Sequence, residues 1–173
     1  MPRAAPLRNV VRASTLPPSV WTSFWSGFND YCSVAEHALP LDLPLRENPP
    51  REGAYFWPLR KNKAYLSSVF YVREELCCRI DIAPNARPEF QKLLEEKEQI
   101  EVELKAGPDH GLKWEEASAK SRWFRISESR HASLDAKDEW RQLSTWMRDR
   151  AVAFHEVFKR RIQILFPESA QRP

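Results

Sequence analysis

The sequence predicts an α+β domain in which three helices cover a mainly antiparallel sheet of about five strands. Apolar residues recur at helical spacing in three stretches of the 173-residue chain,. Short segments rich in Tyr, Val, Ile and Trp lie between these stretches, and the short links between neighbouring segments favour antiparallel pairing. The composition is globular, with 42% hydrophobic and 29% charged residues,. The predicted order is therefore α-β-β-β-α-β-β-α, ending in a long C-terminal helix.

The length fits one domain, which we place at residues 18–167. Residues 1–17 carry three arginines and no acidic residue, so we expect a flexible basic tail there, and a second flexible tail at 168–173. The chain lacks the run of about 18 apolar residues typical of a membrane span, and its N-terminus lacks the apolar core of a secretory signal. Three cysteines without a CxxC pair indicate buried free thiols and a cytoplasmic location.

The first predicted helix follows Pro17 and Pro18, which suit a helix start. Its apolar stripe contains Trp21, Phe24, Trp25, Phe28, Tyr31, Cys32 and Ala35. This stripe is either the core-facing side of the helix or an exposed aromatic platform for a partner.

Three strands are then predicted at residues 55–60, 64–72 and 75–82, with a polar turn at 61–63. The third strand alternates, with Leu76 and Ile80 on one side and Cys77 and Arg79 on the other. Period-two alternation predicts one buried face and one solvated face.

A second helix begins near Pro88 and ends before Gly107 and Pro108,. Two further strands are predicted at residues 112–116 and 122–127. The last helix spans residues 138–166, with Asp138 as its expected N-cap, and we expect Trp146 on its stripe to be buried.

The sequence carries no recognisable catalytic motif. The sequence has no GxSxG, Walker A or GxGxxG motif and no His or Cys cluster with metal-ligand spacing,. Asp81 lies on a predicted strand, but the acid-x-Lys motif that a PD-(D/E)XK nuclease needs does not follow it,. We therefore expect no catalytic residues, no metal and no cofactor, and favour a protein that is not an enzyme.

Cations and aromatic residues alternate around the first predicted hairpin and cluster again near the C-terminus. Such side chains can stack on bases and contact phosphates. The alternative is ordinary cross-strand packing in the hairpin and cations that complement the dipole of the last helix. The candidate binding surface consists of Tyr55, Trp57, Arg60, Lys61, Lys63, Lys159, Arg160 and Arg161.

The pattern of core positions resembles a bacterial family of unknown function. The residues that carry the resemblance are Tyr55 to Tyr65, Leu76 to Ile82, Phe90, Leu93, Lys97, Ile100, Glu101, Leu104, Leu112, Trp114, Glu115, Lys120, Ile126, Trp140, Trp146, Phe154, Phe158 and Ile162. In that family the domain often follows a PD-(D/E)XK-nuclease-like domain. The resemblance implies an accessory or recognition module, here as a stand-alone chain, linked to defence or mobile elements.

The leading hypothesis for function is a non-enzymatic module that binds a protein partner or forms a homodimer. The alternative is a nucleic-acid-binding module accessory to a nuclease, and a third hypothesis is an enzyme with an unrecognised site. Salt separates the first two, because phosphate contacts weaken steeply with ionic strength.

Overall fold

The computed structural model describes residues 18–45, 54–71, 75–105, 111–118 and 122–167. The expected tails lie outside these ranges. The elements are α1 (Pro18–Ser33), η1 (Ala35–His37), β1 (Ala54–Arg60), β2 (Ala64–Tyr71), β3 (Glu75–Ile82), α2 (Arg87–Glu95), α3 (Lys97–Glu103), β4 (Lys113–Glu115), β5 (Phe124–His131), η2 (Lys137–Glu139) and α4 (Trp140–Leu165). The predicted α+β class, the antiparallel sheet and the long C-terminal helix are confirmed.

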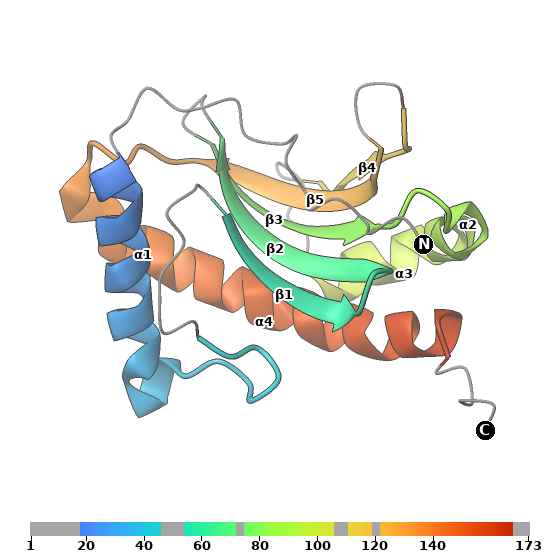
Figure 1. Cartoon of the computed structure of the whole chain (residues 1–173), viewed down its shortest axis with the longest axis horizontal. Coiled ribbons are helices and arrows are strands. Elements are labelled where there is room, and N and C mark those ends of the chain that lie inside the picture. Colours follow the sequence, from blue (N-terminus) through green and yellow to red (C-terminus); the bar gives the residue numbers. More distant parts are fainter. Residues whose placement is uncertain (1–17, 46–53, 72–74, 106–110, 119–121, 168–173) are drawn as a thin grey trace, which may run out of the picture.

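The five strands form one sheet in the order β1-β2-β3-β5-β4, with every neighbouring pair antiparallel (Figure 1). The first three strands form a meander because their connections are short. The chain then passes through α2 and α3, so that β4 takes the outer edge and β5 lies between β3 and β4.

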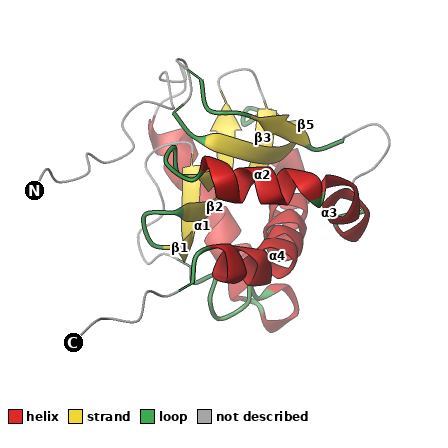
Figure 2. Cartoon of the chain, turned by 90° about the vertical axis from the view of Figure 1, so that its right-hand side faces the viewer, coloured by secondary structure: helices red, strands yellow, loops and turns green. Residues whose placement is uncertain are grey.

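Helices lie on one side of the sheet, with α4 running across it (Figures 1 and 2). Residues directly opposite in an antiparallel pair share a face, which places Tyr55, Ser68, Cys78 and Glu128 in one row. Tyr55 contacts Trp25 of α1 and Glu128 pairs with Arg150 of α4. This side is therefore the core face of the sheet.

The aromatic stripe of α1 belongs to the core. Trp25 and Phe28 are fully buried, and Phe24 is 1% exposed. The interpretation of this stripe as an exposed platform is therefore wrong. The expected burial of Trp146 is also wrong, because its ring is only half-buried and lies under the guanidinium of Arg130, 6.0 Å from the ring centroid.

Two helix predictions need correction. The predicted middle helix is two helices, because Glu96 leaves helical geometry at φ −92° and ψ 9° and separates α2 from α3. The described part of the chain therefore has four α-helices instead of three. The last helix begins at Trp140, and its N-cap position, Glu139, makes no side-chain cap; Asp138 lies in the preceding turn of η2.

The prediction of a solvated face on β3 is wrong as well. Arg79 is 2% exposed and Asp81 is 5% exposed, although both point away from the core face. A buried arginine needs a hydrogen-bonded counter-charge. The polar residues of this second face of the sheet supply it.

Candidate functional site

The second face of the sheet carries a charged network centred on Asp81. Arg79 donates from Nε to Asp81 Oδ2 at 2.7 Å, and Arg125 donates from Nε to Asp81 Oδ1 at 2.9 Å. The hydroxyl of Ser67 donates to Oδ2 at 3.1 Å and accepts from Arg79 Nε at 3.2 Å. One carboxylate from β3 therefore holds two guanidinium groups, one on its own strand and one on β5.

Strand register aligns these residues in two rows. The first row crosses the sheet as Tyr65, Asp81, Arg125 and Glu115, and the second as Ser67, Arg79, Ser127 and Lys113. Lys113 and Glu115 at the β4 edge are exposed. The second face thus carries cations on β3, β5 and β4, with Glu115 as an exposed acid beside them.

An aromatic pair lies next to Arg125 at the end of the sheet. The rings of Tyr65 and Trp123 meet edge to face, with centroids 5.8 Å apart. Both side chains are half-buried. The hydroxyl of Tyr65 accepts a hydrogen bond from the backbone N–H of Asn62 at 3.2 Å. Asn62 has φ 61°, a left-handed conformation that asparagine tolerates better than most residues. This conformation of Asn62 fixes the turn formed by residues 61–63.

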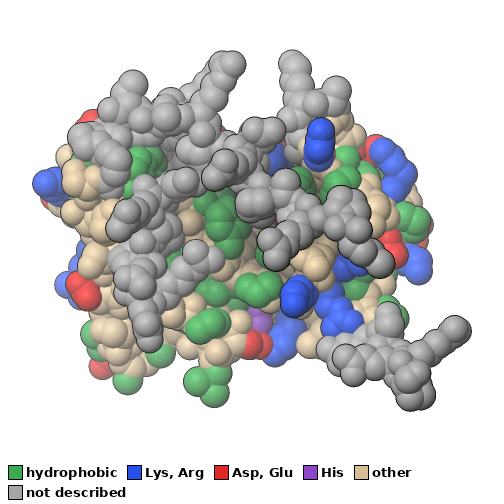
Figure 3. Space-filling view, in the orientation of Figure 1, with side chains coloured by type: hydrophobic (Ala, Val, Ile, Leu, Met, Phe, Trp, Pro, Cys, Tyr) green, Lys and Arg blue, Asp and Glu red, His purple; other side chains and the backbone are tan. Residues whose placement is uncertain are grey.

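We define the basic–aromatic face as the cations and aromatic residues of the second face and of the adjoining β1–β2 turn. It consists of Lys61, Lys63, Tyr65, Lys113, Trp123 and Arg125. The four cations of this face can attract an anion. Its two aromatic rings offer flat apolar surface. Figure 3 shows Lys and Arg side chains gathered near the end of β1 on this side of the molecule.

The structure divides the residues predicted from the first hairpin. Tyr55 and Trp57 are 0% and 1% exposed and lie on the core face, so their place on a binding surface is wrong. Arg60, Lys61 and Lys63 flank the turn; Lys61 is exposed and the other two are half-buried. The prediction missed Trp123 and Arg125, although the alternation in Trp123-Phe124-Arg125 indicates that Phe124 faces the other way,.

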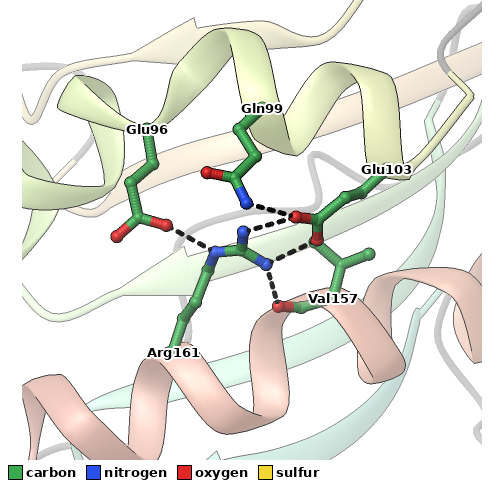
Figure 4. Close-up of polar contacts among 5 residues, drawn as sticks. All are labelled: Glu96, Gln99, Glu103, Val157 and Arg161. Carbon is green, nitrogen blue, oxygen red and sulfur yellow. Dashed lines mark hydrogen bonds and ion pairs between the residues drawn. The ribbon is translucent and has the colours of Figure 1, made fainter.

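The C-terminal cations are largely engaged in structural contacts. Arg161 donates to Glu103 at 2.8 and 2.9 Å, to Glu96 at 2.8 Å and to the carbonyl of Val157 at 2.8 Å (Figure 4). These contacts raise the pKa of Arg161 and lower that of Glu103. Arg161 thereby ties α3 to α4, and the cation predicted for a binding surface is a link between helices.

The other two C-terminal cations, Lys159 and Arg160, differ from each other in their contacts. Lys159 forms an ion pair with Asp42, which lowers the pKa of that carboxyl. Arg160 is exposed, and no ion pair of this residue is found among the described residues. Neither belongs to the charged network around Asp81.

The same Asp42 carboxylate contacts a buried histidine. His155 is 6% exposed, and its Nε2 lies 3.1 Å from Asp42 Oδ2. Burial lowers the pKa of His155 below 6.5, and the nearby Lys159 acts in the same direction, while Asp42 opposes the shift. The pair holds the loop after α1 against α4.

We expect acid to destabilise the fold through His155. Its pKa is lower in the folded chain than in the unfolded chain, so the unfolded chain binds more protons just below pH 6.5 and stability falls as the pH drops through this window. His155→Gln should flatten the dependence of the urea midpoint on pH between 7 and 5. His131→Gln, at an exposed histidine, is the control; equal flattening in both variants would refute the assignment.

The remaining polar chemistry of the described residues is structural. Cys32, Cys77 and Cys78 are buried free thiols, as predicted. Burial raises the pKa of Cys32 and Cys77 to about 12 and that of Cys78 well above its ordinary value. Within the described ranges, no group of three His, Cys, Asp or Glu side chains is placed to hold a metal ion, and no helix is long and apolar enough to cross a bilayer.

Fold and site together define an α+β domain with helices on one face of a five-stranded antiparallel sheet and a charged, aromatic second face. The chain belongs to the family described as Domain of unknown function (DUF4268), whose model matches residues 21–162. The resemblance to an uncharacterised family is thereby confirmed. No curated protein and no solved structure matches this chain.

Proposed function

We propose that this domain is a non-enzymatic module that binds nucleic acid with its basic–aromatic face. The observation that carries the proposal is the juxtaposition of Arg125 with the Tyr65–Trp123 pair on a sheet face opposite the helices. Cations that meet phosphates, next to rings that meet bases, are the two elements of sequence-tolerant nucleic-acid binding.

Charge supports this choice of partner. Lys61 and Lys113 are exposed, and Lys63, two residues before Tyr65 in the chain, is half-buried. The charges of Arg79 and Asp81 neutralise each other. Within the two rows, Glu115 is then the exposed acid whose charge opposes that of the cations. The resulting surface is net positive, which steers a polyanion toward it.

Charge reversal at the turn tests the proposal. We expect Lys61→Glu with Lys63→Glu to weaken binding of a fluorescent oligonucleotide pool about tenfold or more. If both lysines contact phosphates of a single strand, the slope of log affinity against log salt should fall by about 1.4, since each contact contributes about 0.7. Fluorescence anisotropy across a salt series measures both quantities.

The matched control makes the same change in net charge elsewhere. Lys92 and Arg141 are exposed residues of α2 and α4, so Lys92→Glu with Arg141→Glu should leave binding close to wild type. Both double variants should melt near the wild-type temperature. Equal weakening in the two would show a general charge effect and contradict the assigned face.

A protein partner or a second copy of the chain is the other candidate. Leu41 is 101% exposed and Val34 is 50% exposed, both in the segment that follows α1. Exposed apolar side chains can anchor an interface. A dimer seen by light scattering at low and high salt, and lost in Leu41→Asp, would favour this function over nucleic-acid binding.

The cellular setting is part of the same proposal. We place the module in the bacterial cytoplasm as an accessory to a nuclease, in defence or mobile-element biology. Its support is the family resemblance, which is an association and not a mechanism.

A further inference from the structure

We infer that the basic–aromatic face recognises single-stranded nucleic acid, with bases stacked on the Tyr65–Trp123 pair and a phosphate held by Arg125. The inference rests on the proposed function and adds the form of the ligand and the role of each residue. It follows from three observations on the second face of the sheet.

The first observation is the position of the aromatic rings. Tyr65 and Trp123 are half-buried, so a part of each side chain is solvent-exposed, whereas the aromatic residues of α1 that pack the core are fully or nearly fully buried. A partly exposed ring can stack on an unpaired base, and each stacked base contributes strongly to single-strand affinity. The bases of a duplex are already stacked within the helix, so these rings would add nothing to duplex binding.

The second observation is the orientation of Arg125. Its side chain is 15% exposed, and its Nε is tied to Asp81 Oδ1 at 2.9 Å. The other oxygen of Asp81 is bound by Arg79 and Ser67. The carboxylate therefore cannot turn away, and the Arg125 guanidinium is held in one plane by its Nε.

This arrangement leaves the terminal nitrogens of Arg125 for a ligand. No partner of these nitrogens is found among the residues that the structure describes. A planar guanidinium presents paired N–H donors that match phosphate oxygens. Arg79 is 2% exposed, so Arg79, Asp81 and Ser67 are positioning residues and Arg125 makes the contact.

The third observation concerns Glu115, which lies opposite Arg125 in the pairing of β4 with β5. It is exposed on the same face, where its charge opposes a phosphate at Arg125. Its removal should strengthen binding. A residue whose only role is structural would not produce a gain of this kind.

The experiment compares a labelled oligothymidylate with a labelled duplex of mixed sequence by fluorescence anisotropy on the full chain. We expect tighter binding of the single strand. Trp123→Ala should weaken single-strand binding roughly 5- to 150-fold. Trp123→Phe should retain most of the wild-type affinity, because a stacking ring is kept.

Two charge variants complete the test. Arg125→Lys keeps the charge but loses the paired donors, and should weaken binding about tenfold. Glu115→Gln should strengthen it about twofold. Thermal melts check that each variant is folded; Trp123→Phe and Glu115→Gln are mild changes that keep the test decisive if Trp123→Ala or Arg125→Lys unfolds.

The outcomes separate the two levels of the proposal. Equal or tighter binding of the duplex, with Trp123→Ala at wild-type affinity for the single strand, overturns the single-strand inference and leaves nucleic-acid binding standing. Binding of neither oligonucleotide at low salt overturns the proposed function and the inference together.

Discussion

Replacing Asp81 by alanine should lower the free energy of unfolding by about 3–5 kcal/mol, the usual cost of breaking a buried ion pair by removing one partner. Asp81 is 5% exposed and binds Arg79 at 2.7 Å and Arg125 at 2.9 Å. Without the carboxylate, the charge of Arg79 stays in a site that is 2% exposed and loses its ion pair with Asp81. The loss therefore reflects the buried cation more than the value of the pair itself.

Urea denaturation of the wild type and two variants measures this effect. Glu115→Ala is the matched control, because Glu115 is an exposed acid in the same row of the sheet and also lies opposite Arg125. An exposed ion pair contributes only about 0–1 kcal/mol, so this control should stay within about 1 kcal/mol of the wild type. Similar losses in Asp81→Ala and Glu115→Ala would contradict the assigned burial and pairing.

The second large effect is expected at Trp25. Trp25→Ala should cost about 3–5 kcal/mol, since it removes a large buried ring and leaves a cavity. Trp25 is fully buried, and its ring lies 5.2 Å from that of Phe24, 6.1 Å from that of Phe28 and 5.6 Å from that of Tyr55, measured between centroids. This cluster joins α1 to the core face of the sheet, so its loss should loosen the attachment of α1.

Trp146→Ala is the comparison for this prediction. Trp146 is half-buried and lies under Arg130 at the surface of α4, so a smaller loss is expected. Thermal and urea unfolding of both variants give the two values. If Trp146→Ala proves the more damaging change, then the core is centred elsewhere than on the α1 cluster.

The candidate site could be predicted only in part. Lys61 and Lys63 stand out in the sequence because they flank a polar turn between two apolar strands. Period-two alternation places Tyr55 and Trp57 on one face, but it does not say which face the helices will cover. Tyr55 and Trp57 proved to be on the covered face, and Tyr65 and Trp123 provide the aromatic surface beside the lysines.

The cations near the C-terminus show the same limit. Lys159, Arg160 and Arg161 are three consecutive cations, and the sequence alone does not show which of them form ion pairs. In the fold, Arg161 meets Glu103 across 58 positions of the chain, and Lys159 meets Asp42 across 117. Such pairings neutralise charge that composition alone counts as available for a ligand.

Local periodicity was enough to predict the α+β class, the three-strand meander and the long last helix, because helix and strand spacing are set by neighbours along the chain. Contacts between distant segments decide which face of the sheet the helices cover. They also decide which surface charges are neutralised by ion pairs. Asp81 and Arg125 are 44 positions apart, and only the pairing of β3 with β5 joins them. The basic–aromatic face is therefore a product of strand order and register, which no local pattern encodes.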